Sequence, residues 1–339
     1  MTNNLTYFKT LLKNLVIPKT TGLCMSKVWN YMKNKLLEKY NIVNNFSYIN
    51  IVLMLINRCN LNCEYCGATR DGLFKEKKME IDINFIENIF SKPIIGNSLL
   101  VSLLGGEPLL CKDIVEIVSF LSKNGHLSNL FTNGILLRDK IEDLKKAGLT
   151  SINLSIYPES MSYLKNTLLD INKIFPVRSS YVLIKSELER NNNYIFDLIE
   201  FTKKSRCKNI IFWRFGPQGK NPNYEEIVSD DLPSYKNFVY EAKRKYGNYV
   251  YFTGSQVSEK GKNEDEIRKC KYLWEQTLIN ADGTIIPCCG GVPLLDNVNI
   301  ISSSFNEIYN HDTIVDIRSR LLNRNLSLSQ FCQNCKFFY

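Results

Sequence analysis

Three cysteines with the spacing Cys-x3-Cys-x2-Cys, Cys59, Cys63 and Cys66, are the residues of this chain best suited to metal chemistry. They follow the apolar run 51–56, which has the composition of a buried strand. Three soft thiolates can hold three irons of a four-iron cluster. The fourth iron then has no protein ligand and can bind a small molecule, as catalytic metal sites do. The spacing does not match paired zinc knuckles; a chance triplet or a single zinc knuckle is the alternative.

An alternation of apolar runs and amphipathic stretches is expected to position this loop. It predicts strands at 50–56, 98–104, 127–132, 150–157, 178–184 and 209–215, and helices at 82–90, 112–123, 138–147, 159–174 and 192–205. Such an alternation forms a parallel sheet with right-handed crossovers. Six units are too few to close an eight-unit barrel. We therefore expect an α/β fold, a partial (β/α)6 TIM-like barrel, with functional residues at the C-terminal ends of its strands.

Composition divides the chain into four segments. Residues 1–46 predict an N-terminal helical extension, residues 47–216 the barrel core, residues 217–268 a connector with a helix near 231–246, and residues 269–339 a small cysteine-rich α+β domain. The basic, amphipathic extension is expected to pack on the outside of the core. A docking surface for a membrane or a peptide carrier is the alternative.

Overall composition excludes several classes of protein. No apolar run approaches the roughly 20 residues of a membrane span. The N-terminus lacks the features of a secretory signal, so a cytoplasmic location is expected, where the 11 cysteines suit metal thiolates better than disulfides. The net charge of +9 is spread without a run of five like charges, so nucleic acid is not an indicated partner.

Further candidate residues follow the next expected strands. The turn Gly105-Gly106-Glu107 comes after the second strand, where glycines let the backbone approach a ligand and Glu107 adds an acceptor for an ammonium group. Asn133 ends the third strand and Ser155 the fourth. Each signal is weak alone, because strand-to-helix turns often contain glycine and small polar residues.

Together these motifs resemble those of the radical S-adenosylmethionine (radical SAM) superfamily, over about residues 50–339. An aromatic residue, here Tyr65, precedes the third cysteine of its signature. The resemblance implies that S-adenosylmethionine chelates the open iron of a [4Fe–4S] cluster, and that Tyr65, the Gly-Gly-Glu turn, Asn133 and Ser155 contact this cofactor. It also implies reductive cleavage to a 5′-deoxyadenosyl radical that abstracts hydrogen from a substrate, with a flavodoxin- or ferredoxin-type electron donor.

Three cations and one tyrosine complete the expected site. Arg178 and Lys185 stand at the two ends of the fifth expected strand and are candidates for the carboxylate of S-adenosylmethionine, with a solvent-facing charge as the alternative. Arg214 ends the sixth strand among aromatic residues and is interpreted as a substrate contact. Tyr157 stands where the family often has an acid, which departs from the usual ribose contact beside Ser155.

A second set of four cysteines lies in the last segment: Cys270, Cys288, Cys332 and Cys335. The stretch 279–287 contains Asp-Gly and predicts a β-hairpin that returns Cys288 toward Cys270. Zinc would accept four cysteines, so a zinc ribbon is the alternative. The layout resembles the SPASM or twitch domains of the same superfamily, which implies one auxiliary [4Fe–4S] cluster, saturated by four thiolates and suited to carrying electrons.

Three functions are open at this point. The first is oxidation or epimerisation of a small polar molecule, such as a sugar or aminocyclitol alcohol, with the auxiliary cluster as electron conduit. The second is modification of a ribosomally made peptide by epimerisation or thioether formation. Cys289 is then a candidate hydrogen donor, although a small buried hydrophobe is the alternative. The third is a non-catalytic, zinc-stapled binding protein, which the intact Gly-Gly-Glu turn argues against.

Overall fold

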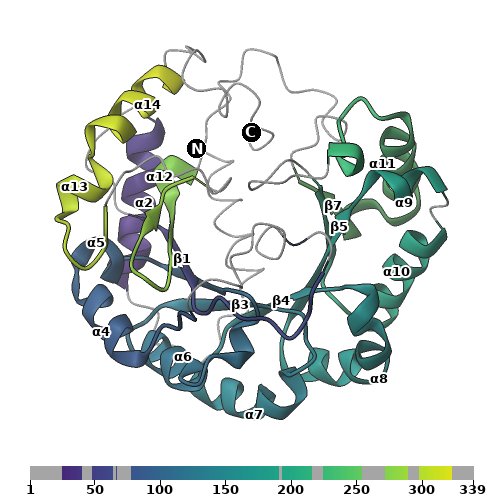
Figure 1. The fold of residues 1–339 in the computed structure, drawn as a ribbon, viewed down its shortest axis with the longest axis horizontal. Coiled ribbons are helices and arrows are strands. Elements are labelled where there is room, and N and C mark those ends of the chain that lie inside the picture. The colour runs from purple at the N-terminus through teal and green to yellow at the C-terminus, as the bar shows by residue number, and fades with distance from the viewer. Residues whose placement is uncertain are drawn as a thin grey trace.

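The computed structural model describes residues 25–39, 48–63, 66, 78–190, 193–215, 224–253, 272–288 and 298–322. Its parallel strands alternate with helices, and the strands form a curved sheet with helices on the convex side (Figure 1). The expected α/β partial barrel is therefore confirmed.

The described chain forms one nine-stranded sheet in the order β7-β6-β5-β4-β3-β2-β1-β8-β9. Neighbouring strands are parallel except β8 and β9. The bounds are β1 Asn50–Met54, β2 Leu100–Leu104, β3 Leu127–Thr132, β4 Ser151–Ser155, β5 Val177–Leu183, β6 Ile210–Arg214, β7 Val250–Phe252, β8 Gln276–Ile279 and β9 Ile285–Ile286. The first six match the expected strands to within about two residues.

The helices that cover the convex face begin and end close to the expected positions. They are α4 Ile83–Ser91, α6 Ile114–Lys123, α7 Leu137–Ala147, α8 Pro158–Ile174, α10 Asn193–Lys204 and α11 Pro233–Tyr246. Their ends follow local chemistry: the Asp82 carboxylate accepts from Phe85 N at 2.8 Å, and Gly148 ends α7 in the left-handed conformation (φ 94°).

The two faces of the central strands differ in chemistry. Residues that point toward the helices, such as Val101, Leu130 and Ile152, are apolar and fully buried. The alternate positions of β2 to β4 on the concave face include a row of aligned polar residues, Ser102, Asn129 and Ser151. Ser151 Oγ donates to Asn129 Oδ1 at 3.0 Å. The inside of the partial barrel is thus partly polar, which suits a polar ligand.

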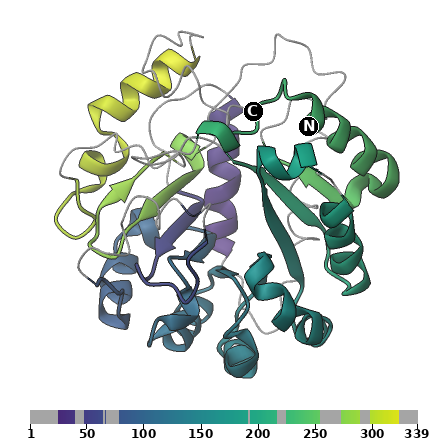
Figure 2. The ribbon, with the colours of Figure 1, turned by 45° about the vertical axis from the view of Figure 1, so that its right-hand side comes forward.

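The sheet is wider than the six strands predicted from sequence. β7 lies in the segment 217–268, which was expected to be a connector, and it pairs with β6. On the other side, β8 pairs in parallel with β1, so the β8–β9 hairpin lies beside the first strand (Figure 2). The sequence did not predict that β7, β8 and β9 belong to the sheet, because these strands are short. Pairing between segments that are far apart in the sequence also leaves no local pattern.

Helix α2 (Met25–Lys39) is the described part of the N-terminal extension, and it packs against the N-terminal ends of β1 to β3. Tyr31 contacts Ile49, Leu99 and Leu127 there. The remaining helices are α5 Pro93–Gly96, α9 Lys185–Arg190, α12 Tyr272–Glu275, α13 Phe305–Tyr309 and α14 Asp312–Leu322. Within the described ranges, no helix combines the length and apolar character needed to cross a membrane.

Candidate metal centre

A cavity of about 200 Å³ opens at the C-terminal ends of β1 to β4. It collects most of the motifs that the sequence indicated. Its described lining comprises Cys59, Leu61, Cys63, Cys66, Leu104, Gly105, Gly106, Phe131, Thr132, Asn133, Ser155 and Tyr157. The three cysteines of the first motif, the Gly-Gly turn, Asn133 and Ser155 therefore share one site.

The three thiols lie on a compact loop directly after β1. Cys66 N donates to Cys63 O at 3.1 Å, and Leu61 N donates to Cys59 Sγ at 3.4 Å. In the described chain, no three Cys, His, Asp or Glu side chains are gathered closely enough to hold a single metal ion. A cluster of several irons spreads its thiolate ligands around a larger body than a single ion does, and three cysteines around one cavity fit that arrangement.

Burial controls the protonation of two of these thiols in the metal-free protein. It raises the pKa of Cys63 to about 12 and also raises the pKa of Cys59, with a smaller contribution from neighbouring acidic groups. The thiols of Cys59 and Cys63 are therefore protonated near neutral pH. Loading with metal must release these protons, because the thiolate is the ligand.

The Gly-Gly turn lies directly against the strand end that leads into the cysteine loop. Gly106 N donates to Ile56 O at 2.7 Å, and Glu107 N donates to Arg58 O at 2.8 Å. A Cβ on Gly106 would lie 2.0 Å from Arg58 O, and one on Gly105 would lie 2.6 Å from Ile56 O. Both glycines are thus required for backbone packing, in addition to any approach of a ligand.

Glu107 is buried and engaged within the protein. Its Oε1 accepts from Thr132 Oγ1 at 2.8 Å and from Leu109 N at 3.0 Å, and its Oε2 accepts from Asn133 N at 2.9 Å. Burial raises its pKa, which these hydrogen bonds partly offset. The carboxylate therefore joins the turn after β2 to the turn after β3, a role that the sequence did not indicate.

Asn133 carries this connection on to the cysteine loop. Its Nδ2 donates to Asn60 Oδ1 at 2.8 Å and lies 4.0 Å from Cys59 Sγ, while its Oδ1 accepts from Ile135 N at 3.1 Å. The side chain is thus held in place from both ends. It orients the first cysteine and lines the cavity at the same time.

Ser155 and Tyr157 line the cavity on the side of β4. The two side chains are hydrogen-bonded, and the pKa of Tyr157 is raised, first by burial and then by the nearby Cys63 and Cys66. The phenol therefore stays protonated and can donate a hydrogen bond. Tyr157 was noted in the sequence only as a departure from the family pattern; its place beside the thiols makes it part of the site.

The two cationic candidates predicted at the ends of the fifth strand lie in different elements. Arg178 is in register with Asn153, which in turn is in register with Phe131 of the cavity lining. Asn153 Oδ1 is buried without a hydrogen-bond partner in the described chain. Lys185 instead begins α9, with its Nζ 3.9 Å from Glu189 Oε1 and a side chain that is 41% exposed.

Arg214 does not belong to the described lining of the cavity. Its side chain is only 3% exposed; Nη1 lies 2.8 Å from Asp230 Oδ1, and the guanidinium lies 5.6 Å from the centre of the Tyr235 ring. The side chain therefore serves a buried ion pair that connects β6 to the segment before α11. This arrangement favours a structural role over the substrate contact that its position at a strand end suggested.

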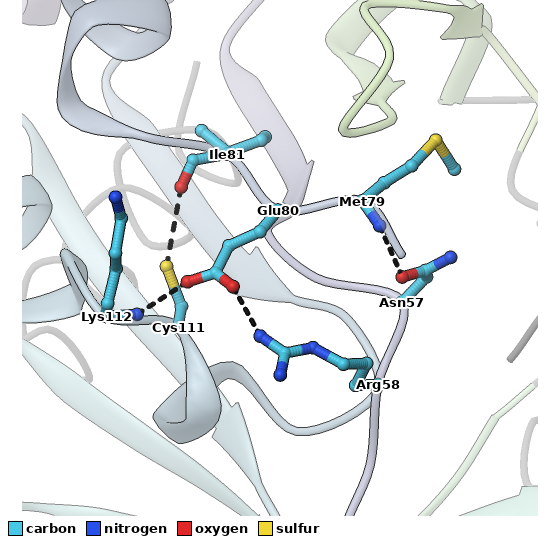
Figure 3. Close-up of polar contacts among 7 residues, drawn as sticks. All are labelled: Asn57, Arg58, Met79, Glu80, Ile81, Cys111 and Lys112. Carbon is cyan, nitrogen blue, oxygen red and sulfur yellow. Dashed lines mark hydrogen bonds and ion pairs between the residues drawn. The ribbon is translucent and has the colours of Figure 1, made fainter. Parts of the chain in front are cut away.

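A polar network at the base of the cysteine loop was missed in the sequence (Figure 3). Glu80 forms an ion pair with Arg58 and accepts from Lys112 N at 2.7 Å. Met79 N donates to Asn57 Oδ1 at 2.8 Å. An isolated glutamate carries no local signal; only its antiparallel bridge to Ile56 brings it to the site.

The second cysteine set is described only in part. The β8–β9 hairpin is confirmed, with Gly283 N donating to Asn280 O at 2.9 Å and Gly283 at φ 85°. Cys288 follows β9 and is half-buried. The other predicted residues, Tyr65, Cys270, Cys289, Cys332 and Cys335, lie outside the described residues.

Two family models match the chain in the regions that carry these cysteines. The model of the radical SAM superfamily matches residues 53–160. The SPASM model, an iron–sulfur cluster-binding domain, matches residues 270–336.

Curated relatives include GTP 3′,8-cyclases. That of Clostridium botulinum (strain Hall) is 32% identical over 257 residues, covering 68% of this chain and 78% of the relative. The probable GTP 3′,8-cyclase of Methanothermobacter marburgensis is 26% identical over 280 residues, covering 75% of this chain and 87% of the relative.

Solved structures share the fold. SuiB of Streptococcus suis, bound to its precursor peptide SuiA, aligns with a TM-score of 0.65 at 19% identity, covering 86% of this chain and 71% of SuiB. The protein anSMEcpe with bound AdoMet aligns with a TM-score of 0.59 at 16% identity, covering 85% of this chain and 87% of that one.

Proposed function

The chain belongs to the radical SAM superfamily and carries a SPASM domain, and from this premise we propose that Cys59, Cys63 and Cys66 hold a [4Fe–4S] cluster that cleaves S-adenosylmethionine. When bound, the cluster would supply the one-electron reduction of the sulfonium through which this superfamily abstracts hydrogen from substrates. The observation that carries the proposal is the convergence of three thiols and the Gly-Gly turn on one cavity.

The chain's own side chains would bind and orient the cofactor. Asn133 and Ser155 supply polar groups in the cavity, and Tyr157 fixes the Ser155 hydroxyl by a hydrogen bond. Arg178 is the cation proposed for the carboxylate of S-adenosylmethionine, because its register places it in the row of Phe131. Lys185 is the weaker candidate, since it is half-exposed and faces Glu189.

For the substrate we propose a small polar molecule, such as a sugar or aminocyclitol alcohol, that is oxidised or epimerised. Among the described residues that line the cavity none is Lys or Arg, whereas Thr132, Asn133 and Ser155 offer neutral hydrogen-bonding groups. These groups support a substrate that carries hydroxyl groups.

A ribosomally made peptide is the second candidate substrate. The observation that favours it is the similarity in fold to SuiB, which was solved with its precursor peptide bound. Epimerisation or thioether formation would then be the reaction. Donation of a hydrogen atom from Cys289 to the substrate radical would distinguish epimerisation from thioether formation.

The SPASM region supports a role in electron transfer. Cys270, Cys288, Cys332 and Cys335 would saturate one auxiliary [4Fe–4S] cluster, so this cluster would take up an electron from the substrate radical without binding the substrate. A flavodoxin- or ferredoxin-type donor would supply the electron for cofactor cleavage. Zinc at this site in a non-catalytic protein is the competing proposal.

The deciding experiment is anaerobic reconstitution followed by product analysis. We expect about eight irons per chain, four per cluster, and release of 5′-deoxyadenosine from S-adenosylmethionine after addition of dithionite. A variant with alanine at Cys59, Cys63 and Cys66 should retain about four irons and release none. Absence of 5′-deoxyadenosine from the iron-loaded wild-type protein would overturn the proposal.

A further inference from the structure

Arg58 occupies the position between the end of the first strand and the first cysteine of the metal loop. Its backbone is fixed, because Arg58 O accepts from Glu107 N at 2.8 Å. Its side chain turns to Glu80, with Nη2 paired to Oε2 (Figure 3). The cation nearest in sequence to Cys59 is thus paired with a carboxylate that follows the cysteine loop in the chain.

Glu80 is anchored at both of its oxygens. Oε2 meets the Arg58 guanidinium, and Oε1 accepts from Lys112 N at 2.7 Å, just after the Gly-Gly-Glu turn. The side chains of the pair are 39% (Arg58) and 22% (Glu80) exposed, so solvent screens them only in part. Glu80 therefore connects the base of the cysteine loop to the turn after β2.

The backbone on both sides of the loop is joined at the same place. Ile56 and Glu80 form an antiparallel bridge, and Asn57 N donates to Met79 O at 3.2 Å. The chain that leaves toward Cys59 and the chain that returns near Met79 are thus paired. The ion pair between Arg58 and Glu80 adds a side-chain contact between the same two backbone segments.

We propose that Arg58 and Glu80 are a positioning pair that closes the cysteine loop and sets the reduction potential of the cluster on it. The inference rests on the proposed function of that loop. A cluster that takes up an electron gains negative charge, so a nearby cation favours the reduced form and a nearby anion opposes it. Because Glu80 neutralises Arg58, the pair keeps the potential lower than Arg58 alone would.

The test is a charge cycle on the reconstituted protein. The midpoint potential is measured by redox titration followed by EPR. The signal of the cluster on the cysteine loop is identified as the one that changes when S-adenosylmethionine is added. Glu80→Gln should shift the potential upward, Arg58→Gln should shift it downward, and the double variant should return close to the wild-type value. Arg58→Lys, which keeps the charge, should leave it unchanged. The matched control is Asp231→Asn, which removes the carboxylate of the exposed pair Lys236–Asp231.

A purely structural role predicts a different pattern. Shifts of the two single variants in the same direction, or no shift, would overturn the electrostatic part of the inference. Limited proteolysis of the metal-free proteins tests closure independently: both single variants should be cut faster than wild type between residues 59 and 78, and equal rates would overturn that part. If the wild type assembles no cluster, the proposed function fails. Proteolysis of the metal-free proteins then still tests whether the Arg58–Glu80 pair holds the ends of the cysteine loop together.

Discussion

At the scale of single residues, the site depends on a buried carboxylate and two glycines that bring three loops together. Glu107 accepts from groups of the turn after β2 and of the turn after β3. Gly105 and Gly106 let that first turn lie against the strand end before the cysteines. Asn133 then reaches Asn60 within the cysteine loop. The metal loop is therefore oriented by contacts from the turn after β2 and the turn after β3, which lie about 45 and 75 residues after Cys59 in the sequence.

The first prediction concerns the steric requirement at Gly106. Gly106→Ala places a Cβ 2.0 Å from Arg58 O, a backbone atom that cannot move without shifting the cysteine loop. We expect a lower melting temperature and loss of iron after reconstitution, measured by calorimetry and iron analysis. Gly247→Ala is the control, because a Cβ there meets nothing within 4 Å and only the backbone conformation, at φ 56°, is strained. Normal iron content in Gly106→Ala would refute the steric argument.

The second prediction separates the two cationic candidates. Arg178→Ala should weaken binding of S-adenosylmethionine to the cluster-loaded protein by about 10- to 100-fold, because a hydrogen bond to a charged group contributes about 1.5–3 kcal/mol. Lys185→Ala should leave the affinity within about twofold, since exposed pairs contribute little. Equilibrium dialysis measures both. The reverse result would assign the carboxylate to Lys185.

At the scale of elements, α2 is attached to the bottom of the barrel by a buried polar contact. Lys27 Nζ donates to His126 Nε2 at 2.9 Å and to Gly96 O, and His126 Nδ1 donates to Ser98 O at 2.9 Å. This arrangement requires a neutral imidazole. Burial, aided by the charge of Lys27, lowers the pKa of His126 to about 3. The contact between Lys27 and His126 is thus made only as long as His126 stays uncharged.

The third prediction is a pH dependence of stability. The pKa of His126 in the folded chain lies below its ordinary value of 6.5. When the pH falls below about 6.5, His126 therefore takes up a proton in the unfolded chain but not in the folded chain. The contribution of His126 to the free energy of unfolding in urea should therefore fall between pH 7 and pH 4.5. His126→Gln, which offers one donor and one acceptor without titrating, should show a smaller slope. Equal slopes in wild type and His126→Gln would contradict the assignment.

At the scale of the whole molecule, one sheet joins the two regions that the family models match. β8 pairs with β1, and Asn50 Nδ2 donates to Gln276 Oε1 at 2.7 Å. Behind this edge, the fully buried Arg318 of α14 donates to Leu273 O at 2.6 Å and to Tyr309 O at 2.8 Å. The described part of the C-terminal region therefore shares its core with the barrel.

The fourth prediction tests this shared core. Arg318→Leu leaves the carbonyls of Leu273 and Tyr309 without their buried donors, at a cost of roughly 1–3 kcal/mol each. Calorimetry should show one transition at a lower temperature. Arg320→Leu, which removes only the exposed pair with Asp316, should change stability by less than about 0.5 kcal/mol. Two separate transitions in Arg318→Leu would show that the regions unfold independently.

The sequence by itself determined the features that depend on neighbouring residues. The cysteine loop after an apolar strand, the Gly-Gly-Glu turn and the Asp-Gly hairpin could be predicted because strand periodicity and turn chemistry act over a few residues. The first six strands and the barrel class follow from the same local patterns. The likeness of these motifs to a known superfamily then supplied the chemistry.

Only the tertiary structure decided which distant residues meet. The register that places Arg178 beside Asn153, the ion pair that buries Arg214 and the bridge that brings Glu80 to Arg58 all depend on pairings between separate segments. So does the pairing of β8 with β1. A strand's local pattern indicates which face is buried, but its partner and register depend on the packing energy of the whole sheet.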